Sequence, residues 1–555
     1  MKRFFLLLFL SFSLTQCAEK QLPESSGPPK VENVPFSWRN ATIYFLLTDR
    51  FFNGNPNNDL NFGRNKPSAK LRGFEGGDIK GVTEKLKDGY FERLGVTAIW
   101  LTPIVEQIHG GTDEGTGITY GYHGYWAKDW TSLDPNFGTE EELLELVDVA
   151  HSQGIRILLD VVLNHTGPVT EKDPVWPASW VREGPTCTYT GFETTVECTL
   201  VENLPDIRTE REEPVDLPEV LANKWKQEGR LEQEIQALEE YFNSNSYPRI
   251  PRFYIIKWLT DYIRKFGIDG FRVDTAKHTE AEVWVELKKE AEKAFSDWKN
   301  NNPDKKLDDN NFFMVGEVYG FGAGGGRAYD YGDKRVDFFE NGFESLINFA
   351  FKYDAKKSYD DLFSKYDAVL HKGSMADYNV LNYLTSHDDG DPFDKTRERS
   401  KEAGTKLLLA SGGAQIYYGD ESDRPLIIDG ATGDAHLRSF MNWEDIDNDP
   451  KVKESLEHWS KLGRFRKNHI SIGDGKHQKH QDNPYVFSRT YTSGDYSDQV
   501  LVALDVAEGE KAISVFNIFP DGTELYDFYS DTSVTVKEGK VTISTPFTIL
   551  LLAEN

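Results

Sequence analysis

One nine-residue stretch, Gly270 to His278, constrains most strongly what this chain can fold into. An apolar run, 268–273, contains a single arginine, Arg272, and ends at Asp274. Short apolar runs of this kind predict a buried strand, in which a charged side chain is costly unless it is paired. An aspartate held ionised by a nearby arginine can act as a nucleophile. A structural ion pair explains this stretch equally well, so the interpretation depends on whether the pattern recurs.

The same pattern, an apolar strand followed by polar side chains, recurs along the chain. Strands alternating with helices predict an α/β fold, a parallel (β/α)8 TIM barrel whose catalytic groups lie at the C-terminal ends of the strands. Polar clusters follow the third, fourth, fifth and seventh strands, and a chance arrangement of four such clusters on one face is implausible. The eight predicted strands are 41–47, 96–101, 155–162, 268–273, 311–316, 345–351, 379–384 and 415–418.

Two segments depart from this alternation. The stretch after the third strand lacks a strand–helix rhythm and predicts an inserted domain, whereas short alternating apolar segments near the end predict a C-terminal all-β sandwich domain. The predicted division is a signal segment 1–17, a linker 18–35, the barrel in two parts 36–165 and 252–470, the inserted domain 166–251 and the C-terminal domain 471–555.

The N-terminal segment predicts an exported protein. Two basic residues precede an apolar stretch, 4–14, that is too short to span a bilayer and has signal-peptide form. It leads to Cys17, in a context that resembles a bacterial lipoprotein processing site, although Gln16 is larger than the usual residue there. We therefore expect a lipid anchor at Cys17, with a soluble periplasmic or secreted product as the alternative. The linker that follows is rich in proline, serine and glycine and is typical of a disordered tether.

Export also bears on the two remaining cysteines, Cys187 and Cys198. In an oxidising compartment a bridge between them would stabilise the fold by about 3 kcal/mol on the loop-entropy model. Two free, partly buried thiols are the alternative. The intervening segment, 188–197, resembles a β-hairpin with a glycine turn.

The composition limits the classes of partner that this chain is expected to bind. The formal net charge is −28 and no basic run stands out, which argues against nucleic acid and anionic membrane surfaces. Membrane contact is then expected only through the anchor at Cys17, and a monomer is expected. The 13% aromatic content suits a protein that stacks on sugar rings, although aromatic-rich cores account for most of it.

Three acids are expected to converge on the C-terminal face of the barrel: Asp274, Glu317 and Asp388. A retaining glycosidase requires a nucleophilic carboxylate and a general acid/base carboxyl about 5 Å apart. Asp274 suits the nucleophile, and Glu317, which follows an apolar strand, suits the general acid because desolvation would raise its pKa. Asp388 would restrain the substrate ring. His123 beside the aromatic residues Tyr125 and Trp126 suits a sugar-binding platform.

Several of these segments together resemble the conserved regions of the α-amylase family of glycoside hydrolases, with the closest likeness to bacterial periplasmic α-amylases. They are residues 123–126, 160–165, 204–206, 270–278, 316–318, 386–388 and 416–421. The resemblance implies that Asp274 is the nucleophile, Glu317 the acid/base and Asp388 the transition-state stabiliser. It also implies sugar-binding residues, with the last two on the leaving-group side: Tyr125, His165, Arg272, His387, Lys277 and His278.

The resemblance further implies Ca²⁺, at one or two sites. The first would lie between the barrel and the inserted domain and use Asn164, Asp206 and the backbone carbonyl of His278. The second would use an early turn that is rich in side-chain oxygens. Without the resemblance, the same residues indicate only an ordinary turn. Its residues are Asn53, Asn55, Asn58, Asp59, Gly76 and Asp78.

The expected activity is that of a retaining, endo-acting α-1,4-glucan hydrolase acting on starch, glycogen or maltooligosaccharides, either periplasmic, attached to the outer membrane or secreted. The nearest alternative is a cyclodextrin glycosyltransferase or a cyclodextrin-degrading relative, which usually has further C-terminal domains. An exo-acting α-glucosidase is disfavoured by the Lys277–His278 pair. A starch-binding lipoprotein without activity is disfavoured because all three carboxylates are present.

Overall fold

Eight parallel strands close into a barrel in the computed structural model, which describes residues 34–64 and 67–554. Every predicted strand contributes, so the predicted (β/α)8 barrel is confirmed. The sixth strand is shorter than predicted because its last three residues turn away and begin the helix α10 (Phe351–Asp354). In order around the barrel the strands are β1 (Thr42–Leu46), β16 (Gly413–Tyr417), β15 (Asn379–Asn382), β14 (Ser345–Asn348), β11 (Phe313–Gly316), β10 (Gly270–Val273), β7 (Arg156–Val161) and β2 (Ala98–Leu101).

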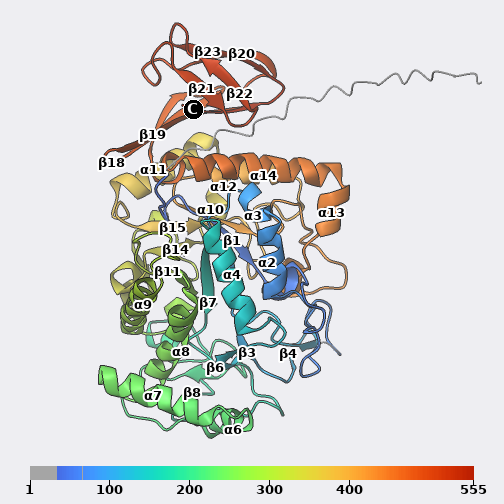
Figure 1. The fold of residues 1–555 in the computed structure, drawn as a ribbon, viewed down its shortest axis with the longest axis vertical. Helices are drawn as coiled ribbons and strands as arrows, with labels where there is room; N and C mark the ends of the chain where they lie inside the picture. Colours follow the sequence, from blue (N-terminus) through green and yellow to red (C-terminus); the bar gives the residue numbers. More distant parts are fainter. Residues whose placement is uncertain (1–33, 65–66, 555) are drawn as a thin grey trace, which may run out of the picture.

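Helices pack around the barrel (Figure 1), and local sequence signals determine where they begin and end. The helix α8 (Pro251–Phe266) begins with a proline, which suits the first helical turn, and ends at Gly267 in the left-handed conformation (φ 77°). A β-carbon at Gly267 would lie 2.2 Å from the Trp298 ring, so this position requires glycine. The other long helices beside the barrel strands are α2 (Ile79–Lys87), α4 (Glu140–Ser152), α9 (Ala281–Asn301), α11 (Tyr359–Lys372), α12 (Ser400–Leu408) and α14 (Pro450–Asn468).

Shorter elements lie in the loops. The two-stranded sheets are β3 (Val105–Gln107) with β6 (Ala127–Leu133), β4 (Thr112–Asp113) with β5 (Ile118–Thr119), β8 (Val181–Arg182) with β9 (Asp206–Ile207), and β12 (Ala328–Asp330) with β13 (Arg335–Asp337). The short helices are α1 (Thr48–Phe51), α3 (Tyr90–Arg93), α5 (Glu193–Val196), α13 (Trp443–Asn448) and α15 (Ser471–Asp474), and the 3₁₀ turns are η1 (Ala276–His278), η2 (Ala323–Gly325), η3 (Phe338–Asn341) and η4 (Gly433–Arg438).

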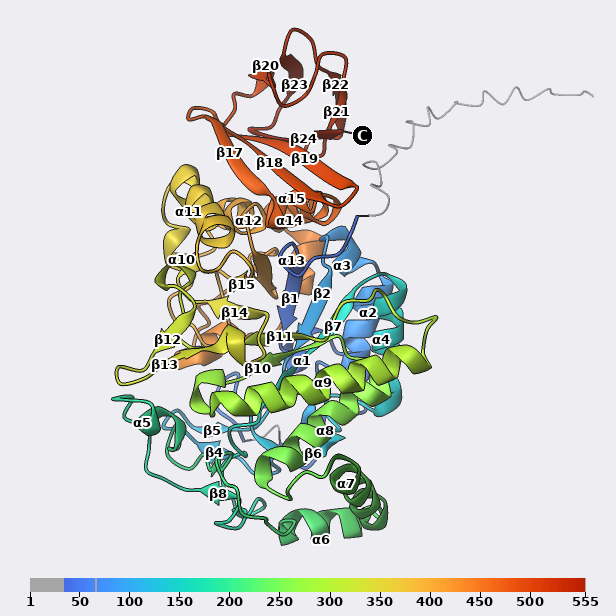
Figure 2. The same cartoon turned by 90° about the vertical axis from the view of Figure 1, so that its left-hand side faces the viewer.

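The segment between β7 and β10 lies below the C-terminal ends of the strands and contains the helices α6 (Glu219–Gln227) and α7 (Leu231–Asn245) (Figure 2). The predicted disulfide between Cys187 and Cys198 is present. The hairpin predicted between these cysteines is wrong, because turns and the short helix α5 occupy the segment. Thr194 and Thr195 each donate a side-chain hydrogen bond to the Gly191 carbonyl, which competes with a strand ladder.

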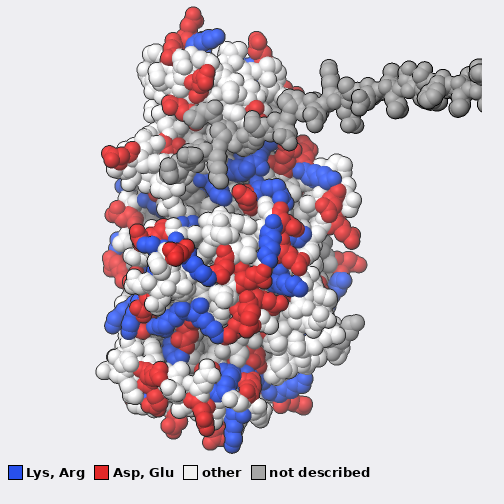
Figure 3. Space-filling model, in the orientation of Figure 1, with Lys and Arg blue, Asp and Glu red and all other residues white. Residues whose placement is uncertain are grey.

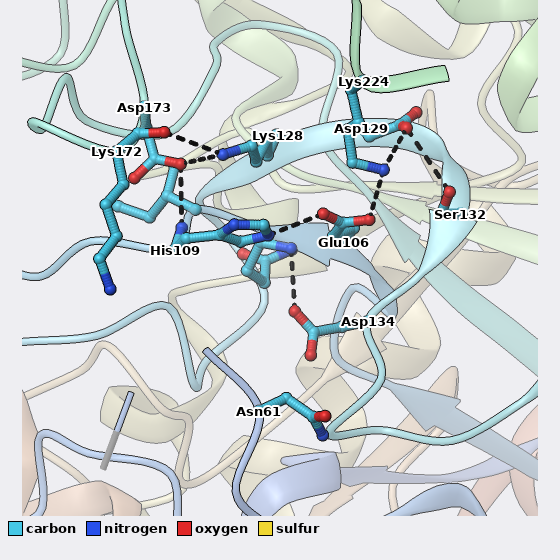
Figure 4. A network of polar contacts seen from close by, with 12 residues as sticks. Asn61, Glu106, His109, Lys128, Asp129, Ser132, Asp134, Lys172, Asp173 and Lys224 are labelled. Atoms are coloured by element: carbon cyan, nitrogen blue, oxygen red, sulfur yellow. Dashed lines mark hydrogen bonds and ion pairs between the residues drawn. The ribbon is translucent and has the colours of Figure 1, made fainter. Parts of the chain in front are cut away.

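A buried ionic network attaches α6 to the β3–β6 sheet (Figure 4). Asp129 on β6 is fully buried and accepts hydrogen bonds from Lys224 Nζ at 2.9 Å and from Arg230 Nη2 at 2.6 Å. Glu106 on β3 lies 2.7 Å from the same Lys224 nitrogen. Although burial acts to raise it, Lys224 and Arg230 hold the pKa of Asp129 below its ordinary value. The charges therefore offset each other, and the network fixes α6 against the sheet.

The end of the chain forms two β-sheets, so the predicted C-terminal all-β fold is confirmed. Apolar side chains from both sheets, such as Leu501 and Val541, share one core separate from that of the barrel, and the sheets lie over α14 (Figure 1). The larger sheet has the order β17 (Lys476–Gln481), β18 (Tyr485–Ser493), β19 (Tyr496–Leu504), β24 (Ile549–Glu554), β21 (Glu524–Asp527) and β22 (Thr532–Thr535), and the smaller pairs β20 (Gly509–Ser514) with β23 (Lys540–Thr545).

Acidic and basic side chains are interspersed over the face drawn in Figure 3. Within the described residues, no helix is both long enough and apolar enough to cross a membrane. The predicted signal segment, Cys17 and the linker up to residue 33 lie outside the described residues.

Candidate active site

A single buried arginine joins three carboxylates at the C-terminal ends of adjacent strands. Arg272, near the end of β10, has a side chain that is only 1% exposed. Its Nη1 lies 2.8 Å from Asp274 Oδ1 and 2.8 Å from Asp160 Oδ1, and its Nη2 lies 3.1 Å from Glu317 Oε2. Asp274 directly follows β10 and Glu317 directly follows β11, which pair in register. The structure thus brings together two acids that the sequence places 43 residues apart.

Burial raises the pKa of both Glu317 and Asp274. Burial raises the pKa of Glu317 from 4.5 to about 7, Arg272 opposes this shift, and the neighbouring charges of Asp274 and Asp388 add to it. The backbone N–H of Thr275 donates a hydrogen bond of 2.9 Å to Glu317 Oε2 and orients the carboxyl group. Burial also raises the pKa of Asp274, and Arg272 opposes that shift. A carboxyl group with a pKa near neutrality can both donate and accept a proton at physiological pH.

Asp388 occupies a different environment on the loop after β15. Its side chain is 44% exposed, and His387 Nε2 lies 2.8 Å from Oδ2. Arg438, at the end of η4, contacts its other carboxylate oxygen. Although burial acts to raise it, His387 and Arg438 hold the pKa of Asp388 well below its ordinary value. Asp388 is therefore ionised and faces the open part of the site. Sequence reasoning missed Arg438, which belongs to none of the recognised segments.

Aromatic rings form one wall of the site. The Tyr125 ring stacks on the His387 ring with centroids 5.2 Å apart, and the Tyr125 hydroxyl donates a 2.8 Å hydrogen bond to Asp160. His165 Nε2 lies 3.1 Å from the Tyr125 carbonyl oxygen. Asp160 lies in a recognised segment but was not among the predicted site residues. Its role is to hold Arg272 and Tyr125 together.

Trp126 and His123 do not present an exposed platform. Trp126 is only 6% exposed and packs with Ile108 and Leu204 in a small apolar cluster. His123 is 5% exposed, and its Nδ1 accepts a hydrogen bond from the Tyr125 backbone N–H at 3.1 Å. Of the predicted sugar-binding platform, Trp126 and His123 are therefore buried, and His123 supports the Tyr125 backbone.

Lys277 and His278 lie on η1, just beyond Asp274. Lys277 Nζ donates hydrogen bonds of 3.2 Å to the Tyr319 carbonyl and to the Tyr329 hydroxyl. His278 Nδ1 lies 2.9 Å from the Thr195 carbonyl oxygen, on the disulfide-closed segment. Both side chains thus connect the barrel to loops that surround the site.

The first predicted cation site contains a buried carboxylate with unused acceptors. Both oxygens of Asp206 are buried and lack a hydrogen bond, although Arg182 Nε lies 2.8 Å from Oδ2. Asn164 Oδ1 accepts only a long bond, 3.4 Å, from Thr279, the residue after His278. These oxygen groups fit a hard cation, which would satisfy Asp206.

The second predicted site fits in part. The side-chain oxygens of Asn53 and Asn58 are buried without a donor, and a β-carbon at Gly76 would lie 2.5 Å from Asn53 Nδ2. Asp78, in contrast, caps α2 and accepts bonds from three backbone N–H groups, among them Gly81 at 2.6 Å. Across residues 34–64 and 67–554, no three His, Cys, Asp or Glu side chains converge as a metal centre. Both sites would therefore need amide and backbone oxygens in addition to carboxylates such as Asp206.

Comparison with known proteins agrees with this geometry. Residues 45–531 match the family model of the alpha amylase catalytic domain. A periplasmic alpha-amylase of Escherichia coli strain K12 is 38% identical over 511 residues, which cover 80% of this chain and 69% of the relative. A cyclomaltodextrin glucanotransferase of Thermoanaerobacterium thermosulfurigenes is 25% identical over 585 residues, 99% of this chain and 71% of the relative.

Solved structures share the fold. An Anoxybacillus alpha-amylase aligns with a TM-score of 0.65 at 23% identity and covers 94% of this chain and 99% of its own. A cyclomaltodextrin glucanotransferase described as the first with a three-domain ABC distribution aligns with a TM-score of 0.63 at 22% identity, covering 92% and 99%. The family model, the relatives and the arrangement of carboxylates around Arg272 lead to one conclusion: this chain belongs to the α-amylase family of glycoside hydrolases.

Proposed function

We propose that this protein is a retaining, endo-acting α-1,4-glucan hydrolase that cleaves starch, glycogen or maltooligosaccharides by double displacement. The observation that carries the proposal is the contact of one guanidinium, Arg272, with both Asp274 and Glu317. Because neighbouring strands position these two carboxyl groups, one can attack the anomeric carbon while the other protonates the leaving oxygen.

The order of the steps follows if Asp274 is charged and Glu317 carries a proton when the substrate binds. Asp274 attacks the anomeric carbon and forms a covalent glycosyl ester, while Glu317 gives its proton to the departing glucosyl oxygen. Glu317, now a carboxylate, then removes a proton from the water that hydrolyses the ester. Asp388, ionised beside Arg438, would accept hydrogen bonds from sugar hydroxyls and favour the positive charge that develops on the ring. Tyr125, His165 and His387 would hold that ring.

A second candidate is glycosyl transfer to form cyclodextrins. A cyclomaltodextrin glucanotransferase described as having a three-domain ABC distribution aligns over 92% of this chain and 99% of its own length, so domains beyond these three are not a requirement for this reaction. A starch-binding protein without activity is disfavoured, because an ordered set of carboxylates around Arg272 is costly to bury and has no use in simple binding.

The proposal includes Ca²⁺ and export. The oxygens of Asp206, Asn53 and Asn58 that lack donors support calcium, which would stabilise the junction between the barrel and residues 166–251 and the turn before α2. The disulfide and the likeness to a periplasmic relative support export. We keep the anchor at Cys17, the monomeric state and the division into barrel, inserted domain 166–251 and C-terminal domain 471–555 as parts of this proposal.

Product analysis tests the function. Purified protein incubated with soluble starch should release mixed maltooligosaccharides early, with the α-anomer formed first when products are followed by proton NMR. Cyclic products as the main species would favour the glucanotransferase instead. No cleavage of starch, maltohexaose or cyclodextrin would refute both enzymatic candidates.

A further inference from the structure

The loop that carries Asp388 is held at a second point, by an ion pair that does not involve Asp388 itself. This loop, residues 384–393, follows β15, and Asp389 comes directly after Asp388. The Asp389 carboxylate forms an ion pair with Lys352, which belongs to the helix α10 after β14. Both residues lie outside the segments that resemble the α-amylase family. We call this contact the Lys352–Asp389 pair.

Lys352 is a buried cation whose polar contacts lie on this loop. Its side chain is only 4% exposed. Besides the ion pair with Asp389 Oδ2, its ammonium group donates a 2.8 Å hydrogen bond to the Asp391 carbonyl oxygen. Burying an ammonium group is costly unless it is paired. The contacts that pair Lys352 therefore also hold residues 389–391 against α10.

Packing does little to hold this part of the loop. Gly390 lies between the two residues that Lys352 contacts, and a β-carbon at Gly390 would meet no atom within 4 Å beyond its chain neighbours. The nearby Asp388 and Asp391 are exposed. Lys395, which is itself exposed, donates a 3.2 Å hydrogen bond to the Gly390 carbonyl oxygen. Buried ionic contacts, rather than packing, therefore restrain the residues that follow Asp388.

Tyr383 completes the surroundings of Asp389. Its hydroxyl donates a 2.8 Å hydrogen bond to Asp389 Oδ2, the oxygen that Lys352 also contacts. Burial raises the pKa of Tyr383 well above its ordinary value and Asp389 adds to the shift, so the hydroxyl remains a donor. The charged and titratable groups that face Asp389 are thus Lys352 from α10, Tyr383 from the end of β15 and its chain neighbour Asp388.

The Lys352–Asp389 pair borders the pocket that holds the proposed catalytic groups. Asp389 and Tyr383 line the same pocket as Glu317 and Asp388. The charged groups that act on Glu317 are Arg272, Asp274 and Asp388, of which only the first is positive. The carboxylate of Asp389 would add one more negative charge beside them. The ammonium of Lys352 balances that charge, so the pair as a whole adds none.

We infer that Lys352 is a positioning residue of the proposed reaction: through Asp389 it holds the loop that carries Asp388 and keeps the charge beside Glu317 balanced. This inference rests on the proposed function and extends it. In that function Asp388 acts on the sugar ring in the transition state, so a misplaced loop lowers kcat more than it raises KM. An unbalanced charge at Asp389 changes the pH at which Glu317 loses its proton, and that pH sets the alkaline limb of kcat/KM.

Two single variants with opposite changes of charge, and their combination, test the inference. The pH dependence of kcat/KM is measured with maltohexaose. Lys352→Met leaves the Asp389 carboxylate without its cation, so the alkaline limb should move up by about half a pH unit. Asp389→Asn leaves the Lys352 ammonium without its anion, so the limb should move down by a similar amount. The double variant removes both charges and should return the limb to its wild-type position.

The kinetic constants separate positioning from a general loss of structure. At its own optimum pH, Lys352→Met should lower kcat about fivefold or more while KM changes by less than about twofold. Lys352→Arg keeps the charge and should retain the wild-type limb and most of kcat. Lys356→Met is the matched control, because it removes an exposed lysine from the same segment, and it should change neither quantity.

Each outcome decides for or against the inference. Limbs of the two single variants that stay at the wild-type position, or that move in the same direction, would overturn it, and so would an unchanged kcat in Lys352→Met. If Lys352→Met does not fold, Asp389→Asn, which keeps the shape of its side chain, provides the shift alone. A wild-type protein that does not cleave maltohexaose would refute the proposed function, which is distinct from an active enzyme that does not respond to loss of the Lys352–Asp389 pair.

Discussion

The raised pKa of Glu317 predicts a stability change that depends on pH. Glu317→Gln keeps the shape of the side chain and removes its ionisation. In the folded protein the Glu317 side chain is 12% exposed, and burial raises its pKa from 4.5 to about 7. The folded state therefore binds the proton more tightly than the unfolded state does, and ionisation of Glu317 costs stability. This cost is absent below pH 4.5, grows between pH 4.5 and 7, and is complete above pH 7.

The size of the pKa shift of Glu317 determines how much stability its ionisation costs. At about 1.4 kcal/mol per pKa unit, it corresponds to roughly 3 kcal/mol at pH 8. The free energy of unfolding of Glu317→Gln relative to wild type should therefore rise by up to about 3 kcal/mol between pH 4.5 and pH 8. Urea unfolding at pH 4.5, 6 and 8, followed by tryptophan fluorescence, measures this difference directly.

Glu232→Gln, at an exposed position of α7, is the matched control and should show no pH-dependent gain. A Glu317→Gln difference that stays constant or falls as the pH rises would refute the reasoning. The same variant should lose starch hydrolysis, yet retain part of its activity on a substrate with a good leaving group, because that substrate needs no proton donor.

Three further outcomes are expected. Asp274→Asn should lower starch hydrolysis about a thousandfold or more while circular dichroism stays unchanged, since it removes only the proposed nucleophile; near-normal activity would mean that the role is misassigned. Asp129→Asn should destabilise the protein by about 3–5 kcal/mol at pH 7 because Lys224 and Arg230 lose a buried partner. Since the pKa of Asp129 is depressed, this difference should shrink as the pH falls below about 4 in urea unfolding. Exhaustive chelation should lower the melting temperature, and Ca²⁺ but not Mg²⁺ should restore it; an unchanged melt would remove both proposed calcium sites.

The barrel could be predicted because each strand has its own local signal. A buried strand is a short apolar run, and in this chain it ends at a polar residue such as Asp274 or Glu317. That end must lie on the catalytic face of a parallel barrel. Strand positions and the two central acids therefore followed from the order of residues alone.

Other features depend on which segments meet in space. Residues 188–197 have the composition of a hairpin, but threonine side chains bond to the nearby backbone and favour turns. Trp126 suits a sugar-binding platform in sequence, yet in the structure it is buried against Ile108 and Leu204. Arg438 reaches Asp388 from 50 residues away, and no local pattern marks it. Each of these depends on tertiary contact rather than on a local signal.

The charges around the site bear on why Asp274 and Glu317, which are both carboxylic acids, are proposed to have different roles. Asp388 has His387 and Arg438 beside it and stays ionised. Asp160, Asp274 and Glu317 must share one guanidinium, that of Arg272. One positive charge cannot balance three buried negative charges, so a proton is retained among them near neutral pH. Asp274 receives a direct 2.8 Å contact from the shared guanidinium, whereas Glu317 receives a longer one of 3.1 Å. In the proposed function Glu317 carries that proton, where the leaving oxygen needs it, and the direct contact with Arg272 favours the charged form of Asp274, the proposed attacking group.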